Sequence, residues 1–234
     1  MKGTLLNTAC IAAGSSLGLA AGRFVPSDYK DVVISGIGLA TALIGVRMFL
    51  RTRNVVVVVA SIALGGIMGA MLGIAPGLNA VAEWSRQQLG GGGRFNEGLI
   101  TTSVLFCVGP MTLLGCLQDG VEGKIELLSL KSTLDAISSF FFAAALGAGV
   151  LVSAAVVLVV QGCITLAAKP LQKIAKDEAL IAETSAVGGA LMLGIALGLL
   201  DVKKMRMETY LPALVLAPVF SWLAHRWGVR KRPA

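Results

Sequence analysis

The segment from Val104 to Phe142, VLFCVGPMTLLGCLQDGVEGKIELLSLKSTLDAISSFFF, places charged residues directly between two strongly apolar runs. Hydrocarbon does not solvate a carboxylate or an ammonium group, so ionisable residues inside membrane helices are rare and mark functional positions. Asp119, Lys131 and Asp135 are such residues here. The segment therefore predicts two membrane helices whose charged groups face protein or water.

The whole chain is more apolar than a soluble domain of its length. Of its 234 residues, 56% are hydrophobic and only 14% are charged, and the mean hydropathy is +0.82. Such a chain lacks the polar surface that a soluble fold presents to water. It is predicted to be a multi-pass membrane protein, with the lipid bilayer as its first partner.

Apolar blocks near the roughly 20 residues that cross a bilayer recur along the chain. The block from Leu134 to Ala168 is too long for one span, and Gly147 and Gly149 interrupt it, which predicts two helices joined by a tight turn. The predicted fold class is therefore all-α, a transmembrane bundle of about eight helices. The alternative is seven, with one helix of that pair re-entrant and its backbone covered by protein or a wet cavity. The other blocks are Thr4 to Ala21, Val32 to Leu50, Val55 to Ile74, Leu99 to Leu117, Thr184 to Leu200 and Tyr210 to Trp227.

The chain is predicted to form a single membrane domain, residues 1–234, with an internal repeat. In each half, spans precede a proline and a polar helix: Pro76 before LNAVAEWSRQQL, and Pro170 before LQKIAKDEAL. A unit of three helices begins and ends on opposite sides of the membrane, so a second copy enters from the opposite face. Such inverted repeats are common in secondary transporters. The predicted units are 1–89 and 97–180, followed by a helix pair over 181–234.

The first polar helix, LNAVAEWSRQQL, has the pattern of a helix lying in the membrane interface. Trp84 is expected at headgroup depth and Arg86 in water. The run from Gly90 to Gly93 lacks the lysine and hydroxyl residue of a phosphate-binding loop and is interpreted as a linker. We therefore expect the polar helix to anchor the chain at the membrane surface and the glycine run to link that helix to the next span.

The net charge of +7 comes from basic residues at helix ends. Aromatic residues are not interleaved with them, so the pattern predicts membrane topology and no nucleic-acid partner. If Arg53 and the basic tail face the cytoplasm, the loop of Lys203 and Arg206 falls outside. The basic groups are Arg47, Arg51 and Arg53; Lys203, Lys204 and Arg206; and Arg230, Lys231 and Arg232.

Small residues recur four positions apart in three of the predicted spans. This spacing lets helix backbones approach closely in lipid, where van der Waals contact replaces the hydrophobic driving force. The ridges favour a compact bundle or a homo-oligomer, and they support an alternative function as a non-transporting scaffold or regulator. They are Gly14, Gly18 and Gly22; Gly65, Gly69 and Gly73; and Ala190, Gly194 and Gly198.

Lys131 and Asp135 are four residues apart, so a helix places their opposite charges on one face, where they neutralise each other. Ser132 extends the polar stripe. Gln161 is the deepest uncharged polar group of the sixth span and needs a partner, because an unpaired amide in hydrocarbon is costly. Asn7 has the same requirement in the first span. Together these groups predict a site centred on Asp135, which Gln161 approaches from the next span.

Three further candidates lie at the ends of predicted spans. Gln118 and Asp119 close the fourth span, where the carboxylate either faces a vestibule or is solvated beside the polar loop. Glu183 lies at the start of the seventh span, where a negative charge favours the helix N-terminus. These residues join the predicted ion-binding set.

The candidate groups are carboxylates, amides and hydroxyls, which suit hard cations or protons. No cofactor is expected; Na⁺ or H⁺ is the expected transported or coupling ion, with Asp135 and Glu183 as ligands if a cation binds. His225 lies in the basic tail, and no Ser-His-Asp set, zinc spacing or phosphate loop indicates an enzyme. The sequence predicts a gradient-driven transporter or channel for a small cation, or for a solute coupled to a cation or proton.

Six short motifs occur in an order and spacing that resemble the YqgA-like family of bacterial inner-membrane proteins. The resemblance covers nearly the whole chain and implies a multi-pass protein of the bacterial inner membrane, with a sodium channel or pump as the expected activity. That family usually has a small residue where Pro110 stands, and the proline is expected to bend the fourth span and free a backbone carbonyl. The motifs are GTLLN from Gly3, FCVGPMTLLGCLQDG from Phe106, LKSTLD from Leu130, VVQG from Val159, ETSAVGG from Glu183 and LPAL from Leu211.

Overall fold

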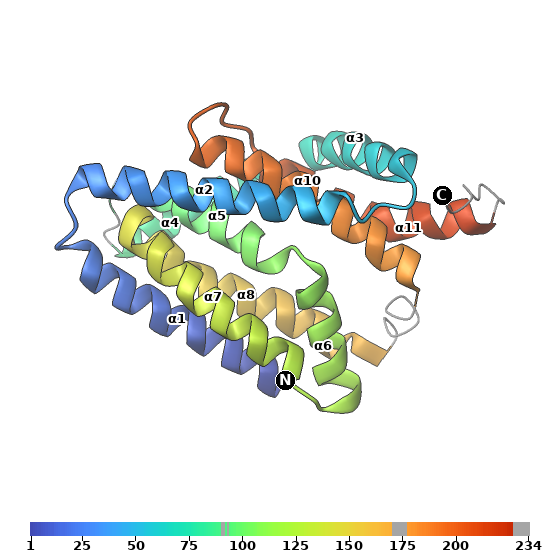
Figure 1. Ribbon diagram of the computed structural model, residues 1–234, viewed down its shortest axis with the longest axis horizontal. Helices are drawn as coiled ribbons and strands as arrows, with labels where there is room; N and C mark the ends of the chain where they lie inside the picture. Colours follow the sequence, from blue (N-terminus) through green and yellow to red (C-terminus); the bar gives the residue numbers. More distant parts are fainter. Residues whose placement is uncertain (90–91, 93, 170–176, 227–234) are drawn as a thin grey trace. The chain divides into compact units, whose positions relative to one another are not determined.

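The computed structural model describes residues 1–89, 92, 94–169 and 177–226, and the regular structure in this part of the chain is helical (Figure 1). The predicted all-α fold class is confirmed. Among the described residues, six helices are long and apolar enough to cross a membrane, or up to eight candidate spans are present if each of two bent helix pairs is one span. The helices are α1 Lys2–Gly22, α2 Ser27–Phe49, α3 Val55–Met71, α4 Ile74–Leu89, α5 Phe95–Cys107, α6 Pro110–Glu122, α7 Glu126–Leu146, α8 Gly149–Leu166, α10 Glu178–Leu199, η1 Met207–Tyr210 and α11 Pro212–Arg226.

Contacts between residues divide the chain into two compact units, and each is described by itself. Helices α1, α5, α6, α7 and α8 belong to unit 1, whereas α3, α10, η1 and α11 belong to unit 2. Helices α2 and α4 contribute residues to both units. Unit 1 comprises Met1–Gly36 and Gly77–Gln172, and unit 2 comprises Ile37–Pro76 and Lys173–Ala234.

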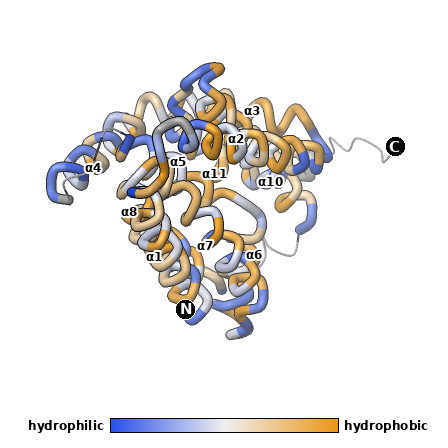
Figure 2. The backbone as a smooth tube through the Cα atoms, turned by 60° about the vertical axis from the view of Figure 1, so that its left-hand side comes forward, coloured by the Kyte–Doolittle hydropathy of each residue, from blue (hydrophilic) through white to orange (hydrophobic). Residues whose placement is uncertain are grey.

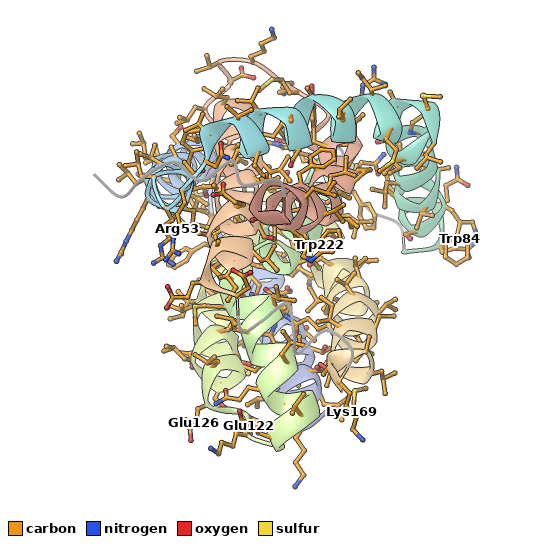
Figure 3. All side chains as sticks on the ribbon, turned by 90° about the vertical axis from the view of Figure 1, so that its right-hand side faces the viewer. Arg53, Trp84, Glu122, Glu126, Lys169 and Trp222 are labelled. Atoms are coloured by element: carbon orange, nitrogen blue, oxygen red, sulfur yellow. The ribbon has the colours of Figure 1, made fainter. Side chains whose placement is uncertain are left out.

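The single membrane domain and its three-helix repeats stay predictions. Most of the Gly90 to Gly93 linker, the start of the polar helix after Pro170 and the basic tail at 230–232 lie outside the described residues. The first polar helix is present as α4, which is hydrophilic along much of its length (Figure 2). Trp84 projects outward from it (Figure 3), although the depth of α4 in a membrane stays a prediction.

In unit 1, α1 and α7 lie side by side and run in the same direction (Figure 1). Asn7 bonds to Asp135 of α7, and further along both helices Gly22 lies on Ala144. Helix α8 runs in the opposite direction, because it begins just after α7 ends and places Gln161 beside Asn7. Both α7 and α8 are long enough to cross a membrane alone, which favours two full spans over the re-entrant alternative.

Helices α5 and α6 form a broken pair that bends by 61°. Helix α5 begins beside the start of α8, where Gly149 lies on Phe95, and α6 ends beside the end of α8, where Gly120 lies on Thr165. The pair therefore passes through unit 1 once, in the direction of α8.

Unit 1 is polar along the seam between α1, α7 and α8 and apolar on its outer faces. Asn7 and Gln161 have no exposed surface, whereas Leu134, on the outer face of α7, is 51% exposed. Helices arranged in this way turn apolar side chains to lipid and pair their polar groups inside. At one end of the unit, Glu122, Glu126 and Lys169 project from the helices (Figure 3).

In unit 2, α3 and α10 run in the same direction. Glu183 of α10 contacts the loop before α3, and near the other end of α3, Gly69 lies on Thr209 of η1. The second half of α2 runs antiparallel to α10 and packs closely on it, with Gly45 against Gly189. Helix α11 returns along α3, and the unit's apolar core consists of Val58, Ala186, Val187, Ala213 and Ala217.

The glycine ridges of α1 and α3 are packing surfaces inside a unit. A Cβ at their positions would overlap heavy atoms of α7 in the first case, and of η1 and α11 in the second. Gly73 departs from the predicted ridge, because its φ of +63° makes it a turn residue. In the third ridge, Gly194 lies against Met207, whereas Gly198 faces open space. The residues in close backbone contact are Gly14, Gly18, Gly22, Gly65 and Gly69.

The packing of α1 on α7 predicts that Gly18→Ala destabilises the protein. Its new Cβ would collide with the Phe140 carbonyl, and overpacking of this kind costs about 1–3 kcal/mol. Thermal denaturation of the purified protein in detergent measures the effect. The matched control is Gly36→Ala on α2, whose Cβ would meet no neighbour within 4 Å. Equal melting temperatures for the two variants would contradict the assignment.

Candidate functional site

Four polar side chains from three helices meet inside unit 1. Asn7 donates through Nδ2 to Asp135 Oδ2 at 3.0 Å and to Gln161 Oε1 at 3.3 Å. Lys131, one turn before Asp135, forms an ion pair with the same Oδ2 atom. Asn7 and Gln161 are fully buried, and the two charged residues are each 7% exposed. These four residues are called the Asp135 cluster below.

Helix geometry explains why these side chains meet. The spacing of four residues between Lys131 and Asp135 places both on one face of α7. On α1, Gly3 and Gly14 share a face with Asn7 and bring the backbone close to α7. The short Asn7 side chain can therefore reach α7 and α8 at once, and the predicted convergence on Asp135 is observed for these residues.

Two polar atoms of the Asp135 cluster have no hydrogen-bond partner within the described part of the chain. They are Oδ1 of Asn7 and Nε2 of Gln161, and both are buried. The orientation of the Asn7 amide follows from its neighbour, because a carboxylate only accepts hydrogen bonds and must face Nδ2. Leaving such a buried group unpaired costs about 1–3 kcal/mol. The cluster therefore offers an amide oxygen and an amide N–H to a small polar ligand.

The break between α5 and α6 lies beside the Lys131 ammonium group. The Phe106 ring, in the last turn of α5, has its centroid 5.8 Å from Lys131 Nζ, within the range of a cation–π contact. Pro110 begins α6 and has no N–H, so the Phe106 carbonyl loses its helical partner. Thr112 Oγ1 donates to that carbonyl instead, at 3.1 Å. The predicted bend is thus present, and the freed carbonyl is satisfied locally.

Asp119 holds the start of α1 and is not part of the Asp135 cluster. Its Oδ2 accepts hydrogen bonds from the N–H groups of Gly3 at 2.9 Å and Thr4 at 3.4 Å. Its Oδ1 forms an ion pair with the α-amino group of Met1 at 2.9 Å, and the side chain is only 2% exposed. The interpretation of Asp119 as a solvated acid is therefore wrong. A carboxylate at a helix N-terminus is favoured by the free N–H groups and the helix dipole.

Gln118 and Ser132 make local hydrogen bonds. Gln118 Oε1 accepts the N–H of Leu127 at 3.4 Å, in the first turn of α7. The Ser132 hydroxyl donates to the Leu128 carbonyl of its own helix at 2.6 Å. Both residues belong to unit 1, but neither bonds to the Asp135 cluster.

Two contacts near the cluster were not predicted from the sequence. The hydroxyl groups of Thr4 and Thr165 lie 3.0 Å apart and join α1 to α8 one turn from Asn7. The spacing of three residues between Thr4 and Asn7 could have indicated this shared polar face. The contact of Phe106 with Lys131 had no comparable sequence signal, because it depends on the bend.

Glu183 caps the start of α3 in unit 2. Its carboxylate accepts the Thr52 hydroxyl at 2.6 Å and the N–H groups of Arg53 and Asn54, each at 2.8 Å. Helix α10 begins at Glu178, so Glu183 lies inside that helix, and the expectation that it starts the seventh span is wrong. The N-terminus that it stabilises belongs to another helix.

Asp135 and Glu183 as cation ligands stay a prediction. Asp135 belongs to unit 1 and Glu183 to unit 2, and each has its own hydrogen-bond partners. Among the described residues, no group of three or more His, Cys, Asp or Glu side chains could hold a metal ion. The oxygen ligands available at Asp135 are instead one carboxylate and neutral amides.

The chain matches the profile of the family described as "Protein of unknown function (DUF554)" over residues 2–222. It belongs to this family. A similar protein is the "Uncharacterized membrane protein YdfK" of Bacillus subtilis (strain 168), 30% identical over 235 residues that cover 98% of this chain and 100% of the relative. The "Uncharacterized protein YqgA" of Escherichia coli (strain K12) is 29% identical over 232 residues, which cover 95% and 97%. No solved structure gives a significant match.

The resemblance to the YqgA-like family is thereby confirmed. The DUF554 match extends from α1 into α11 and includes every member of the Asp135 cluster. With the candidate spans described above, this DUF554 chain is a multi-pass membrane protein.

The capping role of Glu183 predicts that Glu183→Gln lowers stability. An amide oxygen accepts less strongly than a carboxylate, and charge-assisted hydrogen bonds contribute about 1.5–3 kcal/mol. For a chain of this size, each kcal/mol shifts the melting temperature by about 2–4 °C. Thermal unfolding in detergent measures this change. Glu178→Gln is the control, because its ion pair with Arg53 involves an 82% exposed side chain and contributes little; a control that unfolds as early as Glu183→Gln would refute the role.

Proposed function

We propose that this chain is a gradient-driven transporter or channel for a small monovalent cation, and that the Asp135 cluster is its ion site. The observation that carries the proposal is the buried Asp135 carboxylate together with the unpaired Asn7 and Gln161 amide atoms. Ionisable groups at this depth are costly, and in membrane proteins they mark ion pathways and proton relays.

The ligands of the cluster suit a hard cation or a proton. Lys131 Nζ and Asn7 Nδ2 both bind Oδ2 of Asp135, so Oδ1 remains outside these two bonds. Oδ1 of Asn7 is an unpaired amide oxygen. Carboxylate and amide oxygens are ligands that hard cations prefer, and Na⁺ is therefore the first ion to test.

Lys131 makes cation binding a competition. Its ammonium group already neutralises Asp135, and a second positive charge at the same carboxylate would be repelled strongly in a low-dielectric interior. A cation that enters at Asp135 therefore has to displace the Lys131 ammonium group from Oδ2.

The broken α5–α6 pair supplies a place where the protein can change conformation near the ion. Interrupted helices form many transporter sites, because they expose backbone polar groups within the membrane. Here the break adjoins Lys131 through Phe106. Displacement of the Lys131 ammonium group by a cation thus acts on Phe106, in the last turn before the bend.

The scaffold alternative has no specific observation in its favour. Its main support was the glycine ridges, and those of α1 and α3 are occupied by packing within their own units. A homo-oligomer stays a prediction, as does the absence of enzymatic activity. Transport accounts for the Asp135 cluster, which a scaffold does not require.

Ion flux into proteoliposomes tests the proposal. Asp135→Asn removes the charge that holds the cation, and it is expected to reduce sodium-driven flux to the level of empty liposomes. Glu126→Gln, on the same helix but exposed, is expected to keep wild-type flux. Equal flux through wild type and Asp135→Asn across sodium, potassium and proton gradients would end the transport proposal.

Lys131→Met tests the competition for Asp135. Without the ammonium group at Oδ2, sodium is expected to raise the melting temperature more than it does in wild type, since ligand binding to the native state raises apparent stability. Equal stabilisation of the two proteins by sodium would show that Lys131 does not compete for the site.

A further inference from the structure

Unit 2 contains a cavity of about 540 Å³, between the α3–α4 junction and the segment that connects α10 to α11. Its basic and hydroxyl-bearing lining residues are Lys203, Arg206, Thr209 and Tyr210, and the remaining lining is largely small or apolar. A volume of 300–1,000 Å³ is typical of small-molecule sites. The cavity is therefore large enough for a phosphate group with its substituents.

Two tight turns and one close contact shape the walls. Gly73, with a φ of +63°, turns the chain between α3 and α4, and the two helices meet at 59°. Asp201, with a φ of 55°, turns the chain after α10. Gly69 lies against the Thr209 backbone and holds η1 on α3. The positions of the lining residues are thus fixed by the two turns and by the contact between η1 and α3.

The cavity has an excess of positive charge. Lys203 and Arg206 line it, and no acidic residue does. Within the described residues neither forms an ion pair, whereas the adjacent Lys204 lies outside the lining and pairs with Asp201 at 3.5 Å. Both residues are exposed, so their uncompensated positive charge is available to attract an anionic ligand.

The positive-inside rule accounts for the basic residues at only one end of unit 2. Arg53 lies beside Glu183 in the first turns of α10, whereas Lys203 follows the other end of this helix, about 24 Å from Glu183 at 1.5 Å per residue. The basic groups at the two ends of unit 2 cannot both face the cytoplasm, as the positive-inside rule prefers. If Arg53 faces the cytoplasm, the group at the cavity needs a different explanation.

We propose that this cavity binds the phosphate group of an anionic phospholipid. Lysine and arginine bind phosphate, and the Thr209 and Tyr210 hydroxyls add hydrogen-bond donors. Basic pockets between transmembrane helices bind the headgroups of anionic lipids. The adjoining end of α3 exposes Met71 and Leu72, at 83% and 67%, which gives the acyl chains an apolar surface. Free phosphate shares the headgroup chemistry but gains nothing from that surface.

Thermal unfolding in nanodiscs tests this proposal independently of transport. Wild type is expected to melt several degrees higher in phosphatidylcholine nanodiscs containing one quarter phosphatidylglycerol than in phosphatidylcholine alone. Lys203→Gln and Arg206→Gln are each expected to lose at least half of that shift. Lys204→Gln removes the same charge from the same loop and is expected to keep it.

Three results would overturn the assignment. The first is the absence of a phosphatidylglycerol shift in wild type. The second is a shift in Lys203→Gln and Arg206→Gln equal to that in Lys204→Gln, which would indicate a general charge effect. The third is an equal stabilisation by millimolar inorganic phosphate in phosphatidylcholine nanodiscs, which would assign the cavity to a free anion. Melting in phosphatidylcholine alone shows that each variant is folded.

Discussion

The Asp135 carboxylate is the constraint on which the arrangement of unit 1 depends. A charge buried in a membrane protein is tolerated only with partners, and removing one partner of a buried pair costs about 3–5 kcal/mol. Lys131 supplies the opposite charge from the same helix, and Asn7 supplies an N–H group from α1. Asn7 reaches Asp135 because small residues bring α1 close to α7. Helix packing and charge neutralisation thus depend on each other.

The three buried acidic residues of the predicted ion-binding set differ in their hydrogen-bond partners. Asp119 and Glu183 each accept backbone N–H groups at the start of another helix, and this structural role accounts for their burial. Asp135 accepts from side chains only, and its neighbours Asn7 and Gln161 have unpaired atoms. A structural role alone leaves that pattern unexplained, which is why the ion site is proposed at Asp135.

Sequence reasoning identified the members of the Asp135 cluster because local rules apply to them. The spacing of Lys131 and Asp135 places them on one helix face, and the depth of Gln161 in an apolar run requires a partner. The same reasoning failed for Asp119 and Glu183. A carboxylate at the end of a span has the same local sequence whether it meets water or the N-terminus of a distant helix. Only the tertiary fold decides between the two.

Local sequence signals also predicted where helices end or bend, whereas the packing partners of those helices depend on the tertiary fold. Gly147 and Gly149 correctly indicated the turn between α7 and α8, and Pro110 indicated the bend before α6. The glycine ridges indicated close packing but not its partners, and Gly73 proved to be a turn residue. Small residues indicate that another helix backbone can approach closely. Which helix approaches depends on the packing of the whole bundle.

Sodium binding to the wild type and to Asp135→Asn tests the central claim most directly. Isothermal titration of the two detergent-solubilised proteins with sodium measures the number of ions bound and their affinity. We expect one sodium site in the wild type that Asp135→Asn abolishes, because the carboxylate supplies the negative charge that attracts the cation. No sodium binding to the wild type, or equal binding to both proteins, would contradict the account.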